Sequence, residues 1–140
     1  MKKYRVMVDT TSLISGLVFG GVEHRLLKLA EEGKIILVLS DFIIEETRRI
    51  LRLKFGSKSL LFNEFLEIIK PEIIEIKDYK HLIDDYKDSI EDPKDLPILT
   101  AAIKTKPDFF ISGDKHFNTQ KVKRLLNVIS SRDLICKFDG

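Results

Sequence analysis

The sequence has 140 residues, of which 44% are hydrophobic and 33% are charged, with a formal net charge of +2. This length supports one domain, residues 1–140, with its own hydrophobic core, and no apolar run approaches the roughly 20 residues of a membrane-spanning helix. The single cysteine, Cys136, excludes an internal disulfide and a thiolate zinc site, so we expect a cytoplasmic protein.

Five short apolar runs rich in β-branched residues are typical of strands, at residues 4–8, 35–39, 73–76, 109–111 and 127–129. Helical patterns lie between them, at residues 24–32, from Ser40 or Asp41 to about Leu53, at 60–69, at 96–104, and after Ser130 or Ser131. Strands that alternate with helices predict an α/β fold with a largely parallel sheet. Because ligands bind beyond the carboxyl ends of strands in such sheets, chemistry is expected there.

Acidic residues stand next to these strand ends. Asp9 directly follows the first strand, and Asp114 follows the fourth after a Ser-Gly turn, whereas Asp95 opens the helix at 96–104. An acid at the end of a buried strand loses hydration unless something offsets that loss. Each also has a purely structural explanation, because Asp9 and Asp95 can cap the turns that follow them and Asp114 can stabilise its own turn.

Glu46 is expected on the inward side of its helix. Five residues of that helix define one apolar arc: Ile43, Thr47, Ile50, Leu51 and Leu53. At about 100° per residue Glu46 falls inside this arc, whereas Glu45 points to solvent. A carboxylate on the inward side needs a cation or several hydrogen-bond donors, and a structural salt bridge would also serve.

Carboxylates that converge without a cation repel one another, and some are forced to take up protons. Oxygen ligands suit Mg²⁺ or Mn²⁺, and such a centre can activate water for attack on a phosphodiester. The three histidines lack the paired spacing of a zinc hydrolase. We expect His116, close to Asp114 in sequence, to be a surface side chain or a phosphate contact rather than a ligand.

Charge is distributed unevenly along the chain. From residue 101 onward there are eight Lys and Arg against four acids, whereas residues 84–95 are predominantly acidic. Such runs are often only solvated surface, so they do not by themselves indicate a nucleic-acid partner.

Four segments in order resemble the PIN-domain nucleases, and within them the toxin components of prokaryotic toxin–antitoxin pairs. They are VMVDTTSLISGLVF (6–19), LSDFIIEETRRIL (39–51), EDPKDLPILTAAI (91–103) and FFISGDKHF (109–117). The resemblance implies a PIN-like three-layer α/β/α sandwich with a five-stranded, largely parallel central sheet. Members of the group often have Asn two residues after the first aspartate, where this chain has Thr11.

The resemblance also implies roles for individual residues. Four acids match the catalytic and metal-binding acids of the family: Asp9, Glu46, Asp95 and Asp114. Six neighbours would orient those acids or contact the substrate: Thr10, Thr11, Asp92, Ser112, Lys115 and His116. The implied activity is endonucleolytic cleavage of RNA by metal-activated water, with one or two Mg²⁺ or Mn²⁺ ions and with Lys115 and Lys121 near the RNA backbone. The implied partners are a second copy of the chain and a small antitoxin.

Three alternatives stay open. An inactive PIN scaffold would bind RNA or a protein partner without cleaving anything. A phosphatase of the haloacid-dehalogenase type also begins with a strand and an aspartate, but it requires a second aspartate at the position of Thr11. A response-regulator receiver requires an acidic pair by the first strand and a central phospho-accepting aspartate, and neither is apparent.

Overall fold

A computed structural model describes residues 3–139 and contains a five-stranded sheet. The strands are β1 (Tyr4–Val8), β2 (Ile35–Ser40), β3 (Glu72–Ile74), β4 (Phe109–Ile111) and β5 (Val128–Ile129). Their order across the sheet is β3-β2-β1-β4-β5, and every neighbouring pair is parallel. All five carboxyl ends therefore lie at one edge of the sheet.

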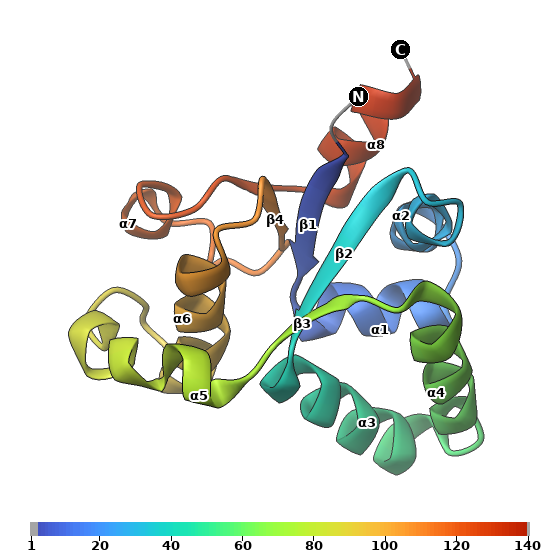
Figure 1. Cartoon of the computed structure of the whole chain (residues 1–140), viewed down its shortest axis with the longest axis horizontal. Helices are drawn as coiled ribbons and strands as arrows, with labels where there is room; N and C mark the ends of the chain where they lie inside the picture. Colours follow the sequence, from blue (N-terminus) through green and yellow to red (C-terminus); the bar gives the residue numbers. More distant parts are fainter. Residues whose placement is uncertain (1–2, 140) are drawn as a thin grey trace.

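Helices cover the sheet from two sides (Figure 1). They are α1 (Thr10–Val18), α2 (Val22–Glu31), α3 (Asp41–Phe55), α4 (Lys58–Ile69), α5 (Ile76–Tyr79), α6 (Leu96–Thr105), α7 (Gln120–Lys123) and α8 (Ser131–Asp139). Short 3₁₀ turns occupy Lys80–Leu82, Asp84–Tyr86 and Pro93–Asp95. In Figure 1, α5 and α6 lie on one side of β1 and β2, and α1 and α2 lie on the other. The expected α/β class with a five-stranded parallel sheet is confirmed.

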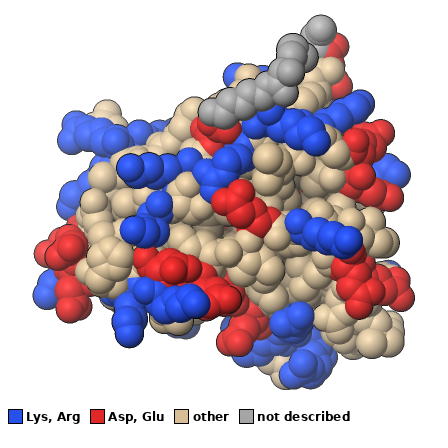
Figure 2. Space-filling model, viewed as in Figure 1, with Lys and Arg blue, Asp and Glu red and all other residues tan. Residues whose placement is uncertain are grey.

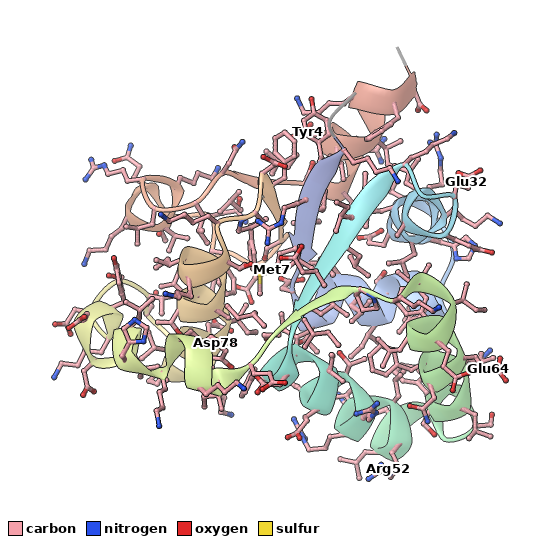
Figure 3. All side chains as sticks on the ribbon, in the orientation of Figure 1. Tyr4, Met7, Glu32, Arg52, Glu64 and Asp78 are labelled. Carbon is pink, nitrogen blue, oxygen red and sulfur yellow. The ribbon has the colours of Figure 1, made fainter. Side chains whose placement is uncertain are left out.

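The central strands are buried on both faces, which explains their nearly continuous apolar sequences. Val6, Met7 and Val8 of β1 are almost completely buried, as are Phe110 and Ile111 of β4. Met7 of β1 lies in the interior of the molecule (Figure 3). Burial of each such side chain contributes about 1.5–3 kcal/mol, and this packing fixes where the strand ends lie.

Hydrogen bonds at the end of β2 explain why the strand expected at 73–76 ends early and why α5 begins directly after it. The hydroxyl of Ser40 accepts a 3.1 Å hydrogen bond from the Ile43 amide and caps α3. The next residue, Asp41, accepts hydrogen bonds from the Ile76 amide and the Tyr79 hydroxyl, both at 2.8 Å. Those bonds hold the chain in a helical turn, so the strand expected at 73–76 ends at Ile74 and Ile76 begins α5.

Other expectations need correction as well. Helix α1 was not expected, because Thr10, Thr11 and Gly16 weaken its helical pattern. Leu53 was assigned to the buried arc of α3, but it is 71% exposed, because at about 100° per residue it lies about 200° from the buried Leu51. The last helix does form, and Ser130 caps it through a 3.0 Å hydrogen bond from the Asp133 amide.

Candidate metal centre

Asp9 lies where β1 gives way to α1, and it is 4% exposed. Its Oδ1 accepts a 2.9 Å hydrogen bond from the Ser12 amide, so it does cap the following helix. Its Oδ2 accepts a 2.5 Å hydrogen bond from the Ser112 hydroxyl. Burial raises the pKa of Asp9, with a contribution from the charge of Asp114, although the hydrogen bonds from Ser112 and Ser12 oppose the rise. The capping role and a ligand role are compatible, because a carboxylate offers about four acceptor positions.

Asp114 is held by the turn that follows β4. Its amide donates to the Ser112 hydroxyl at 3.1 Å, and its Oδ1 accepts from the His116 amide at 2.7 Å. The Asn118 side chain donates to the carbonyls of Ser112 and Asp114 at 3.1 and 2.8 Å. Phe117, which lies between Asp114 and Asn118 in sequence, is buried against Phe110. Asn118 was not predicted from the sequence, because its contribution is apparent only once the turn is formed.

Asp95 does not cap α6 through its side chain, contrary to the structural explanation considered for it. Its Oδ2 is buried and accepts no hydrogen bond. Burial raises the pKa of Asp95 to about 6, and the negative charges of Asp114 and Asp92 add to the effect. Asp92 caps the 3₁₀ turn at Pro93–Asp95, where its Oδ1 accepts a 3.0 Å hydrogen bond from the Lys94 amide. A buried carboxylate oxygen without a donor is the kind of atom that a bound cation satisfies.

His116 faces these acids instead of the open surface, and its side chain is 22% exposed. Its Nδ1 lies 3.3 Å from Oδ2 of Asp95 and 3.4 Å from Oδ1 of Asp114. One possible ligand atom each from Asp92, Asp95 and His116 lie within 4.8 Å of one another. The carboxylates of this group suit a divalent cation, and the unpartnered oxygen of Asp95 is consistent with one.

A cleft of about 290 Å³ opens beside Asp9 and Asp114. It is also lined by Thr11, Ser12, Ser15, Glu23 and Gly113. Thr11 is exposed at this cleft, whereas the Thr10 hydroxyl is buried and has no hydrogen-bond partner. Glu23 was not predicted from the sequence, because an acid in the first turn of a helix is ordinarily explained by the helix dipole.

Glu46 is half-buried and Glu45 is exposed, so the expected difference between the two side chains is observed. Glu46 lines a different cleft, of about 590 Å³, together with Phe42, Glu45, Arg48, Arg49 and Arg52. Arg52 extends outward from α3 in Figure 3. Within residues 3–139, Glu46 makes no hydrogen bond or ion pair. The structure thus places Asp9 and Asp114 at one cleft and Asp95 and Asp114 on either side of His116, whereas Glu46 lines a different cleft.

The basic side chains near these acids differ in their surroundings. Lys115 is exposed. Lys121 donates a 2.7 Å hydrogen bond to the carbonyl of Asp88, so it links α7 to the acidic loop. Figure 2 shows basic and acidic side chains interspersed over one face of the molecule. Among the residues described, no helix is both long and apolar enough to span a membrane.

Comparisons with known proteins agree with this architecture. The fold is similar to that of a chain in the crystal structure of VapBC2 from Rickettsia felis bound to a DNA fragment from their promoter. The TM-score is 0.62 and the sequence identity is 18%, and the match covers 90% of this chain and 96% of that chain. No curated protein matches the sequence. A family model described as PIN domain matches residues 5–116, a range that includes all four candidate acids. The chain belongs to the PIN-domain family.

Proposed function

We propose that this chain is a metal-dependent endoribonuclease whose cation is held by Asp9, Asp95 and Asp114. The observation that carries the proposal is the buried Oδ2 of Asp95, which makes no hydrogen bond although Nδ1 of His116 lies 3.3 Å away. The negative charge of a carboxylate is unfavourable in such a position. A proton and a cation therefore compete for it at neutral pH, and a cation that binds well is favoured. Membership of a nuclease family supports the same reading.

The residues of the chain have separable tasks in this mechanism. Ser112 and the Ser12 amide orient the Asp9 carboxylate, and Asn118 holds the turn that carries Asp114. A bound Mg²⁺ or Mn²⁺ ion, or a pair of ions, supplies Lewis acidity that favours deprotonation of water and offsets charge on the phosphodiester. Asp92, Thr10 and Thr11 border these groups and help to fix them. Glu46 is proposed to act as a direct or water-mediated ligand when RNA is bound.

RNA is the substrate we propose, in single-stranded or looped form, because an open cleft reaches an accessible backbone more easily than a duplex. The cleft beside Asp9 has room for a phosphate group, and Lys115 is exposed near it. Lys121 is less suited to contact the backbone than we expected from the sequence, since its ammonium group already donates to Asp88.

We propose further that residues 1–140 form one domain and act as the toxin component of a toxin–antitoxin pair in the cytoplasm. The four segments that resemble this group support the assignment, and so does the fold shared with a chain of the VapBC2 assembly. A small antitoxin would then block the cleft, and the toxin would form a homodimer. Detection of a small protein that copurifies with the chain and inhibits it would test the pairing.

Cleavage of defined RNAs with Mn²⁺ and with EDTA tests the enzymatic proposal. We expect cleavage with Mn²⁺ only, abolished in Asp9→Asn and Asp95→Asn, and unchanged in Asp85→Asn, which alters an exposed aspartate. Circular dichroism would verify that each variant is folded. Full activity in both Asp9→Asn and Asp95→Asn would sink the assignment, and a wild-type protein that binds RNA without cleaving it would indicate an inactive scaffold.

A further inference from the structure

We propose that Nδ1 of His116 is a direct nitrogen ligand of the metal centre and makes it prefer a transition-metal ion to Mg²⁺. The inference rests on the metal site of the proposed function and specifies its ligands and metal. It also replaces our expectation that His116 is a surface side chain or a phosphate contact.

The spacing of three atoms is the first argument. Nδ1 of His116 lies 3.3 Å from Oδ2 of Asp95 and 3.4 Å from Oδ1 of Asp114. Neighbouring ligands of a tetrahedral ion with metal–ligand distances of about 2.0–2.1 Å lie about 3.3–3.4 Å apart, and those of an octahedral ion about 2.9–3.0 Å apart. Each oxygen therefore lies at the spacing of a neighbouring ligand from Nδ1 of His116, and one ligand atom each from Asp92, Asp95 and His116 lie within 4.8 Å of one another.

The surroundings of Oδ2 of Asp95 point to the same role for His116. Oδ2 of Asp95 is buried and accepts no hydrogen bond, although Nδ1 of His116 is only 3.3 Å away. An ion pair formed for stability would direct the ring N–H at that oxygen. The lone pairs of this oxygen are therefore free for a cation that Nδ1 of His116, 3.3 Å away, can share.

The position of the ring is set by the fold. The amide of His116 donates to Asp114 at 2.7 Å, and the adjacent Phe117 is buried in the core. Asn118 holds the same turn from its other side. Because the backbone on both sides of His116 is fixed, little conformational entropy is lost when the imidazole binds a metal.

The choice of metal follows from the ligand type. Imidazole nitrogen suits Mn²⁺ less than it suits Co²⁺ or Zn²⁺, but all three accept it more readily than Mg²⁺, which favours oxygen ligands and retains water. A site in which His116 joins the carboxylates should therefore bind Co²⁺ and Zn²⁺ most tightly, then Mn²⁺, and Mg²⁺ least.

Metal binding to the full chain without RNA tests this directly. Calorimetry would compare Mn²⁺, Co²⁺ and Mg²⁺ for the wild type, for His116→Gln and for the control His81→Gln, which changes an exposed histidine. We expect His116→Gln to lose at least about 10-fold in Co²⁺ and Mn²⁺ affinity and less than about 3-fold in Mg²⁺ affinity. His81→Gln should match the wild type.

Electron spin-echo spectroscopy of the Mn²⁺-loaded wild type gives a readout that does not depend on any variant. A ¹⁴N coupling that changes on ¹⁵N labelling of histidine, is lost in His116→Gln and persists in His81→Gln is the expected result. Absence of nitrogen coupling in the wild type, or an unchanged Mn²⁺-to-Mg²⁺ preference in His116→Gln, would overturn the inference. Nitrogen coupling without RNA cleavage would contradict the proposed function alone, whereas Mg²⁺-dependent cleavage without nitrogen coupling would contradict this inference alone.

Discussion

The hydroxyl of Ser112 donates a 2.5 Å hydrogen bond to Oδ2 of Asp9 and so joins the end of β4 to the end of β1. The same hydroxyl accepts a 3.1 Å hydrogen bond from the Asp114 amide. Parallel pairing of Val8 with Ile111 brings these residues to the same level at the edge of the sheet. One small side chain therefore sets the position of two acids that are far apart in sequence.

Removal of this hydroxyl should weaken the metal centre more than the fold. In Ser112→Ala, Asp9 loses a donor to its charged form, so its already raised pKa should rise further. We expect a destabilisation of about 1–2 kcal/mol and a loss of about 10-fold in Mn²⁺ affinity, measured by denaturant unfolding and calorimetry. Ser15→Ala is the control, because Ser15 lines the same cleft without a bond to Asp9. Equal Mn²⁺ affinities for the two variants would contradict the role of Ser112.

Asp95→Asn should stabilise the metal-free protein at pH 7 but not at pH 4. The folded-state pKa of Asp95, about 6, exceeds its ordinary value of 3.8, so the folded protein holds this proton more tightly than the unfolded chain. The corresponding stability is complete below about pH 4 and is lost as the pH rises through about 6. At pH 7 the neutral amide should therefore add about 1–2 kcal/mol, a figure reduced for the 17% exposure of the side chain.

Denaturant unfolding in EDTA at both pH values would measure this effect. The difference between wild type and Asp95→Asn should shrink to near zero at pH 4. Addition of Mn²⁺ at pH 7 should reverse the order, because only the wild type gains full binding energy from the metal. A difference that is the same at both pH values would show that burial of the charge is not its cause.

Much of the fold could be predicted from the sequence because local patterns and global packing agree. The strands at Tyr4–Val8 and Phe109–Ile111 were predicted with their observed bounds, since both are short apolar runs buried on two faces. Helix α1 was missed because its formation depends on the Asp9 cap and on packing against its neighbours. Helix α5 depends on Asp41, 35 residues earlier than Ile76, and no local pattern reveals such a bond.

The site could be predicted less completely. Asp9 and Asp114 were identified because each follows a strand. The burial of Asp9 is as expected for an acid at the carboxyl ends of the strands. The orientation of His116 towards Asp95 could not be inferred, because the two residues belong to different elements that the fold brings together. Glu23 was missed because the helix dipole already explains an acid in the first turn of a helix, and its place at the cleft beside Asp9 depends on the fold.

Gly16→Ala should destabilise the contact between α1 and α2. A Cβ at this position would lie 2.7 Å from Cδ1 of Leu27 and 2.9 Å from the carbonyl oxygen of Glu23, and backbone cannot yield easily. We expect a net loss of about 1–2 kcal/mol in unfolding free energy, after the better helix propensity of alanine offsets part of the overpacking. Gly20→Ala, where no atom lies within 4 Å of the new Cβ, should change stability little. Equal stability of both variants would contradict the close packing described for α1 and α2.

Glu46→Gln should reduce RNA cleavage while the fold remains intact. Glu46 is half-buried and lies on α3 beside Arg49, but it makes no hydrogen bond or ion pair within residues 3–139, so its loss should alter unfolding free energy by less than about 0.5 kcal/mol. If it binds the metal directly or through water once RNA is present, cleavage should fall at least about 10-fold. Glu45→Gln, one residue earlier and exposed, is the matched control and should retain wild-type cleavage. Cleavage rates measured at saturating Mn²⁺ would test whether Glu46 takes part in the reaction. Equal rates for the two variants would exclude Glu46 and leave Asp9, Asp95 and Asp114 as the acids of the centre.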